Sequence, residues 1–230
     1  MINDYYSVSY LPIDTDGFIE ELNIISRFYR SHGINRIFMS LTYDPAVTVS
    51  AYLSRSSAYF ANARRSLCTN VKLVPIHTVT LFEGLSEISD LYRLALKSGT
   101  SSFLYINIPL GISRDVLATE LHHIIYKHKL TPVFTRIESV AQFSEKQVFD
   151  TLLSVPNATH LFSLPYITNR DSAKLIRRLI ADGKNVIFGS ADGFDACPYK
   201  NVDFYKKHLI RAIGKENFGY YMIRHNRFFK

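Results

Sequence analysis

The feature that most constrains the fold is a regular alternation of short apolar segments with longer amphipathic ones. The first unit shows the pattern. A segment of alternating residues begins at Asp4 and ends at Pro12 and the polar Asp14–Gly17 turn. An amphipathic stretch follows at once. Strands are therefore expected at 4–11, 34–43, 71–80, 102–108, 132–137, 160–164 with the region of Ile167, and 185–189.

Helices are expected between these strands, at 16–32, 45–67, 85–94, 114–127, 145–153 and 171–181, and then at 201–213 and 216–223. About seven such units with short connections predict an α/β fold with a parallel sheet, which is either a barrel or a doubly wound sheet. No linker or low-complexity segment divides the chain, so residues 1–230 are expected to form a single domain.

The net charge of +7 is concentrated in a basic segment at 200–230, which is expected to be helical. Its lysines and arginines far outnumber its two acidic residues, Asp203 and Glu216. This excess of positive charge favours binding to an anionic membrane surface, nucleic acid or an acidic protein. Two solvated lysine-rich helices without a partner would have the same excess. Because the charges are spaced out and no nucleic-acid-binding motif accompanies them, a nucleic-acid partner is not expected.

Several sequence features together predict a cytoplasmic protein. The first residues show neither the basic nor the apolar region of a secretory signal, and no apolar run reaches the roughly 18 residues of a transmembrane segment. Cys68 and Cys197 are too few for a disulfide framework, which fits a reducing compartment.

A resemblance to a known family rests on five segments taken in order: LPIDTDG, HGINRIFMSLTY, TPVFTRIES, DGKNVIFGSADGFDACPY and RHNRFF. Their order and spacing resemble the capsule-operon phosphotyrosine phosphatases of the CpsB and YwqE type, in the polymerase-and-histidinol-phosphatase (PHP) superfamily. The resemblance covers essentially the whole chain. It implies a distorted (β/α)7 barrel, similar to a TIM barrel, with divalent metals, typically manganese, that activate water at the carboxyl ends of the strands.

The chain departs from the family at the positions that the resemblance assigns to metal ligands. The family's H-x-H, its next histidine, its two glutamates, its strand-five histidine and its D-x-H fall, in that order, on Ser7, Ser9, Thr42, His77, Asn107, Arg136, Ala191 and Gly193. A one-residue shift moves the last pair to Asp192 and Phe194, and the phosphate-binding arginines are replaced at Ser139 and near Cys197. Divalent metals need carboxylate and imidazole ligands, so the resemblance implies a pseudoenzyme with no intact catalytic residue and no cofactor.

Three interpretations of these positions stay open. In the first, they form a pocket that binds phosphotyrosine, a sugar phosphate or an acidic polymer without cleaving it, because a guanidinium is a planar fork for anions; its residues are Arg136, His77, Asn107, Ser7, Ser9 and Thr42. In the second, the barrel mouth is filled, with Arg136 paired to Glu138 or an aspartate. In the third, an active hydrolase uses manganese or another divalent metal at a reorganised site of His77, Asp192 and Asp195.

The resemblance also implies a role in capsule or exopolysaccharide regulation. Its expected partners are a tyrosine kinase, with its phosphorylated tail, or another exopolysaccharide-assembly protein. The basic segment at 200–230 would suit an acidic or membrane-bound partner. A homo-oligomer is a further expectation, because members of the family assemble into rings through surface helices.

Overall fold

The computed structural model describes residues 6–7, 16–31, 36–81, 90, 93, 104–127, 131–163, 167–190 and 202–219. Its strands are β1 (Tyr6–Ser7), β2 (Arg36–Thr42), β3 (Lys72–Thr80), β4 (Leu104–Asn107), β5 (Pro132–Thr135), β6 (Thr159–Ser163) and β7 (Asn185–Ser190). Its helices are α1 (Asp16–Ser31), α2 (Val49–Ser66), α4 (Arg114–His122) with the π-helix η1 (His123–Lys127), α5 (Ile137–Phe143), α6 (Lys146–Ser154), α7 (Arg170–Ala181) and α8 (Val202–Ile213).

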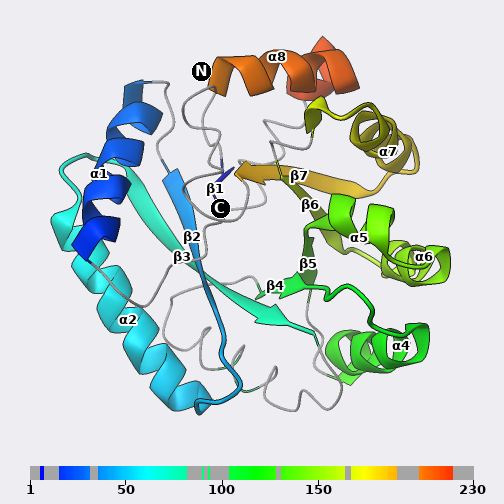
Figure 1. Ribbon diagram of the computed structural model, residues 1–230, viewed down its shortest axis with the longest axis horizontal. Helices are drawn as coiled ribbons and strands as arrows, with labels where there is room; N and C mark the ends of the chain where they lie inside the picture. Colours follow the sequence, from blue (N-terminus) through cyan, green and yellow to red (C-terminus); the bar gives the residue numbers. More distant parts are fainter. Residues whose placement is uncertain are drawn as a thin grey trace.

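The strands form one sheet in which every described pairing is parallel, so the predicted α/β fold with a parallel sheet is confirmed. The strand order is β1-β7-β6-β5-β4-β3-β2. From β2 to β7 it follows the chain, without the reversal that defines a doubly wound sheet. The helices lie around the outside of the strands (Figure 1). Strand β1 also contacts β2, although no described ladder joins the two.

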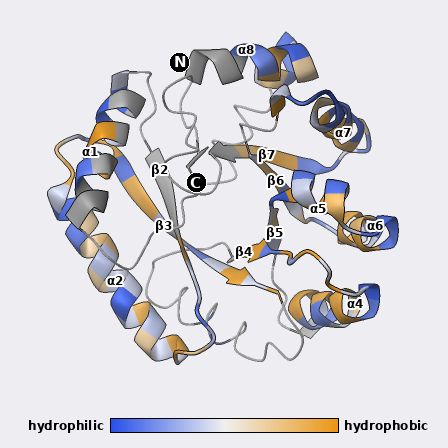
Figure 2. Cartoon of the chain, in the orientation of Figure 1, coloured by the Kyte–Doolittle hydropathy of each residue, from blue (hydrophilic) through white to orange (hydrophobic). Residues whose placement is uncertain are grey.

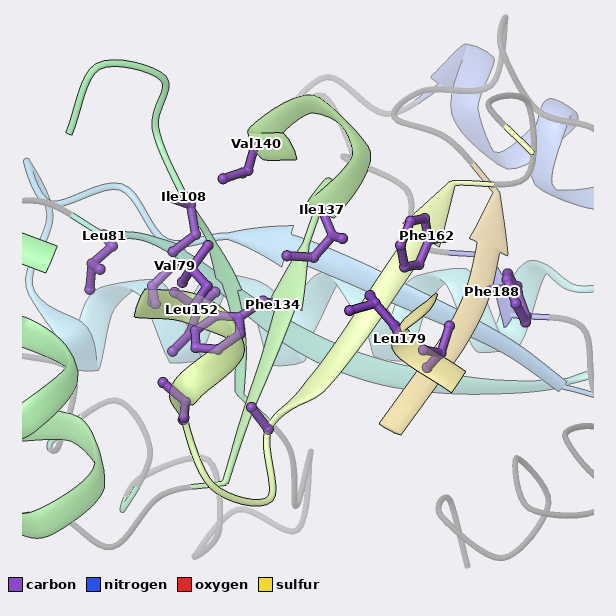
Figure 3. Close-up of a cluster of buried hydrophobic side chains, with 14 of the residues drawn as sticks. Val79, Leu81, Ile108, Phe134, Ile137, Val140, Leu152, Phe162, Leu179 and Phe188 are labelled. Atoms are coloured by element: carbon purple, nitrogen blue, oxygen red, sulfur yellow. The ribbon is translucent and has the colours of Figure 1, made fainter. Parts of the chain in front are cut away.

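Side chains on the two faces of the sheet have different neighbours, because successive residues of a strand point to opposite faces. One set packs against the helices and forms the main apolar core, which includes Val79, Ile108, Phe134, Phe162 and Phe188 (Figure 3). The outer sides of α4, α6 and α7 carry hydrophilic residues (Figure 2). We call the opposite face of the sheet, which is turned away from the helices, the inner face.

The inner face contributes its own buried residues. Tyr105, Val133, Leu161 and Ile187 are buried, but they are not part of the apolar core beneath the helices. Each alternates with a core residue of the same strand, such as Phe134 beside Val133. The inner face therefore carries buried residues of its own, separate from the apolar core beneath the helices.

The largest difference from the sequence prediction lies after β5. A strand is expected at 132–137, but β5 ends at Thr135 and helix α5, which the sequence did not predict, begins at Ile137. Arg136 between them adopts a left-handed conformation, with φ 56° and ψ 36°. Glycine is the residue that usually marks such a turn, so an arginine there leaves no local signal in the sequence.

Smaller differences concern three other predicted elements. Ile167, expected in a strand, lies in a short 3-10 turn, and the helix expected at 114–127 becomes a π-helix over its last five residues. The helix expected at 85–94 is described only at Asp90 and Arg93, both helical. None of the helices in the described ranges is both long enough and apolar enough to cross a membrane.

Truncation of a core side chain on α6 should strongly destabilise the chain. Leu152 is fully buried in the apolar core, so Leu152→Ala removes packed methyl groups and leaves a cavity. We expect the free energy of unfolding to fall by about 2–5 kcal/mol, measured by urea denaturation. The control is Ile24→Ala on α1, where the side chain is 49% exposed and the expected loss is within about 1 kcal/mol. Equal losses in the two variants would contradict this assignment of the core.

Candidate functional site

A group of uncharged polar side chains occupies the inner face near the carboxyl ends of β2 to β5. The strand register pairs Thr42 with Thr78 and Thr78 with Tyr105 in one row. In the next row, nearer the carboxyl ends, it pairs Thr80 with Asn107 and Asn107 with Thr135. Directly paired residues of parallel strands share a face, so these side chains lie side by side. We call this group the polar inner face: Thr42, Thr78, Thr80, Tyr105, Asn107 and Thr135.

Several of these polar atoms are buried without a hydrogen-bond partner among the described residues. They are Thr42 Oγ1, Tyr105 Oη and Asn107 Oδ1, and Thr159 Oγ1 of β6 shares the property. A buried polar group left without a partner costs about 1–3 kcal/mol. Thr135 differs, because its hydroxyl donates to the carbonyl of Ile106 at 3.4 Å. The polar inner face therefore has unused hydrogen-bonding capacity in a place where that is costly.

Tyr105 is the deepest member of the polar inner face. It is fully buried, and burial raises the pKa of its phenol above its ordinary value of 10. The phenol consequently stays protonated at physiological pH and keeps both a donor and an acceptor.

Arg136 stands at the carboxyl end of β5, directly after Thr135. Its left-handed backbone turns the chain from the strand into α5, and its carbonyl accepts hydrogen bonds from Ser139 N at 3.0 Å and Val140 N at 3.2 Å. The side chain is half-buried. A left-handed arginine persists only where its surroundings impose it, and such residues gather at binding and catalytic sites. The backbone thus places an arginine at the strand end, directly after Thr135 of the polar inner face.

Glu138 secures the turn that carries Arg136. It lies in the first turn of α5, is 5% exposed, and its Oε1 accepts a hydrogen bond from Ser163 N at 3.3 Å. Ser163 is the last residue of β6, so this bond ties α5 to the neighbouring strand end. The resulting arrangement places Arg136 between two anchored elements, β5 and α5.

His77 lies on the opposite face of β3 from Thr78, beneath α2. Tyr52 Oη donates to the carbonyl of Leu41 at 2.6 Å and lies 3.1 Å from His77 Nδ1. Because the single phenolic proton is used by Leu41, Nδ1 must be the donor in the contact with Tyr52. Burial lowers the pKa of His77 to about 4, so the imidazole is neutral at physiological pH.

The structure thus separates His77 from the residues with which the sequence grouped it. Thr42 and Asn107 belong to the polar inner face, and Arg136 is at the neighbouring strand end, whereas His77 is a buried hydrogen-bond donor to α2. Neighbouring residues of a strand alternate between faces, so His77 and Thr78 cannot both point inward. In this arrangement Thr78 and Thr80 occupy the inward positions of β3.

The other predicted residues fall at or beyond the limit of the described chain. Ser7 pairs with Ser190 where β1 meets β7. Ser9, Ala191 and Gly193 lie outside the described residues, and so do Asp192 and Asp195 of the alternative metal site. Within the described ranges, histidine, cysteine, aspartate and glutamate gather nowhere in threes as a metal site requires. The hydroxyl and amide groups of the polar inner face do not fit a catalytic manganese cluster.

Sequence reasoning missed Thr78, Thr80 and Tyr105. Their signal was period-two alternation, which links Tyr105 to Asn107 and links Thr78 to Thr80 on one face of their strands. The relation of β3 to β4 could not be obtained in this way, because it depends on the register between the two strands.

Comparison with known proteins assigns no activity to this site. No family model matches the chain, and no curated protein matches it. Among solved structures, the chain is similar to the adenine deaminase from Arthrobacter aurescens, with 13% identity and a TM-score of 0.43 over 85% of this chain and 68% of the deaminase chain. At that TM-score neither the fold nor the activity of the deaminase carries over to this chain.

Acidification should destabilise the fold through His77. Its pKa is about 4 in the folded chain and 6.5 ordinarily, so between these values the unfolded chain binds a proton that the folded chain does not. The free energy of unfolding therefore falls as the pH falls through this window, by up to about 1.4 kcal/mol for each pH unit. His77→Gln should reduce the dependence of the unfolding free energy on pH, measured by urea denaturation at a series of pH values. Part of the dependence should remain, because burial also lowers the pKa of His160.

The matched control for this measurement is His122→Gln, which replaces an exposed histidine of α4. It should keep the slope of the unmodified chain. An unchanged slope in His77→Gln would show that His77 takes up its proton equally in the folded and unfolded states.

Proposed function

We propose that the chain is a catalytically inactive relative of the PHP-type phosphotyrosine phosphatases, and that it binds an anionic ligand without cleaving it. In this proposal the parallel sheet closes between β1 and β2 as a distorted (β/α)7 barrel. The sequential strand order and the contact between β1 and β2 support closure. The ligand would sit at the carboxyl ends of β3 to β5, where β/α folds carry their sites.

One observation carries the proposal: Arg136 directly follows Thr135 at the carboxyl end of β5, where an enzyme of this type needs metal ligands. Arg136 is fixed there by its left-handed turn and by the anchoring of α5 through Glu138. A planar guanidinium binds phosphate or carboxylate through two parallel hydrogen bonds. Its permanent positive charge opposes a divalent cation at the same place.

The biological setting we propose is capsule or exopolysaccharide regulation, with a tyrosine kinase or another assembly protein as the partner. It rests on the resemblance of the sequence segments and on the basic segment at 200–230. Exposed basic residues also occur on the described part of α7 and α8, where Arg177, Lys207 and Arg211 face solvent. A positive surface of this kind speeds the association with an acidic partner.

Removal of the Arg136 guanidinium should abolish most of the anion binding. Arg136→Ala deletes two charge-assisted hydrogen bonds, so we expect inorganic phosphate and a phosphotyrosine peptide to bind at least about tenfold more weakly in isothermal titration calorimetry. Arg136→Lys keeps the positive charge but loses the planar guanidinium, so its affinity should lie between those of the unmodified chain and Arg136→Ala. The control is Arg177→Ala, an exposed arginine of α7. Equal affinity in Arg136→Ala and Arg177→Ala would contradict the proposed site.

The purified chain should hold divalent metal well below one ion per chain and should not hydrolyse aryl phosphates when manganese is added. The reason is the donor set, since the hydroxyl, amide and guanidinium groups at the described strand ends are poor metal ligands. Elemental analysis and a p-nitrophenyl phosphate assay check this. Stoichiometric manganese with turnover would favour the active-enzyme alternative, and Asp192→Asn with Asp195→Asn would then abolish the turnover.

A further inference from the structure

The buried acceptors of the polar inner face point to the kind of ligand that would complete them. Asn107 Oδ1 can only accept a hydrogen bond, and it lies in the row nearest Arg136 without a partner among the described residues. Thr42 Oγ1 and Tyr105 Oη of the next row are unpaired in the same way. An unpaired carbonyl-type acceptor repels an anionic oxygen and is satisfied by an O–H or N–H donor.

The site therefore combines two different chemical demands. Arg136 at the end of β5 suits a phosphate or carboxylate, while the row Thr80, Asn107 and Thr135 beside it is uncharged and contains hydroxyls and an amide. Thr80 and Asn107 are half-buried and Thr135 is buried, so the row is partly exposed to solvent. A ligand that meets both demands carries an anionic group next to several hydroxyl donors.

Building on the proposed anion site, we infer that its ligand is a phosphorylated sugar. The phosphate would contact Arg136, and the sugar hydroxyls would donate to Asn107 and exchange hydrogen bonds with Thr80. A phosphotyrosine side chain meets the first demand only, because its aromatic ring has no donor to offer the Asn107 acceptor. Sites built to hydrogen-bond a ligand hydroxyl reject analogues that lack it, because the buried polar groups are then left unpaired.

The test compares glucose 1-phosphate, inorganic phosphate and a phosphotyrosine peptide by calorimetry on the full chain. Glucose 1-phosphate should bind at least about tenfold more tightly than either of the other two probes. Asn107→Leu, which keeps the volume and removes the amide, should bring this preference to threefold or less and leave the affinity for inorganic phosphate unchanged. Thr80→Val should lower the preference in the same direction, and Arg136→Ala should weaken all three probes together.

Thr119→Val on α4 is the matched control, since its threonine is exposed and should leave the preference unchanged. Thermal unfolding of each variant shows whether it is folded. If Asn107→Leu is not folded, the change in preference measured with Thr80→Val decides the test. Equal affinity for glucose 1-phosphate and inorganic phosphate would overturn the sugar inference and leave the anion site standing. Tighter binding of the phosphotyrosine peptide would overturn it in favour of a peptide ligand, and no binding of any probe would overturn the proposed function as well.

Discussion

The register of the parallel strands is the constraint on which the rest of the structure depends. It places Val79, Ile108 and Phe134 on the face that packs beneath the helices, and in doing so it commits the alternate residues to the inner face. A shift of one residue in any pairing would exchange the two sets. The apolar packing that stabilises the fold therefore also decides which polar side chains meet near the carboxyl ends.

Much of the fold could be predicted from the sequence, because hydrophobic alternation and turn residues are local signals. The predicted strands over 71–80 and 185–189 correspond closely to β3 and β7, and a parallel sheet follows from the alternation of strands with helices. Helix α5 escaped prediction for an equally physical reason. The turn that begins it is made by Arg136 in a conformation for which arginine has no preference, so the surroundings and not the local sequence impose it.

The candidate site was less predictable, because it depends on relations between strands. Asn107, Thr42 and Arg136 were all chosen from the sequence, and the structure places them on the inner face or at its edge. His77 was chosen with them, yet its imidazole is buried against Tyr52 beneath α2. A shift of one position along a strand moves a side chain from the inner face to the face beneath the helices. The sequence of one segment does not show which of its alternate residues lie beneath the helices.

Charge and burial together decide how the proposed site would discriminate between ligands. An exposed arginine binds anions weakly and with little selectivity, because water competes and salt screens the charge. Arg136 is half-buried, and the row that begins beside it includes Asn107 Oδ1, which has no partner among the described residues. In the proposed site an anion would gain most when it also brings a donor for that acceptor. The hydrogen bond from Ser163 N to Glu138 matters in this proposal because it anchors α5, and with it the backbone of Arg136, to the end of β6. In the proposed site, selectivity would come from the neutral groups and affinity from the charge.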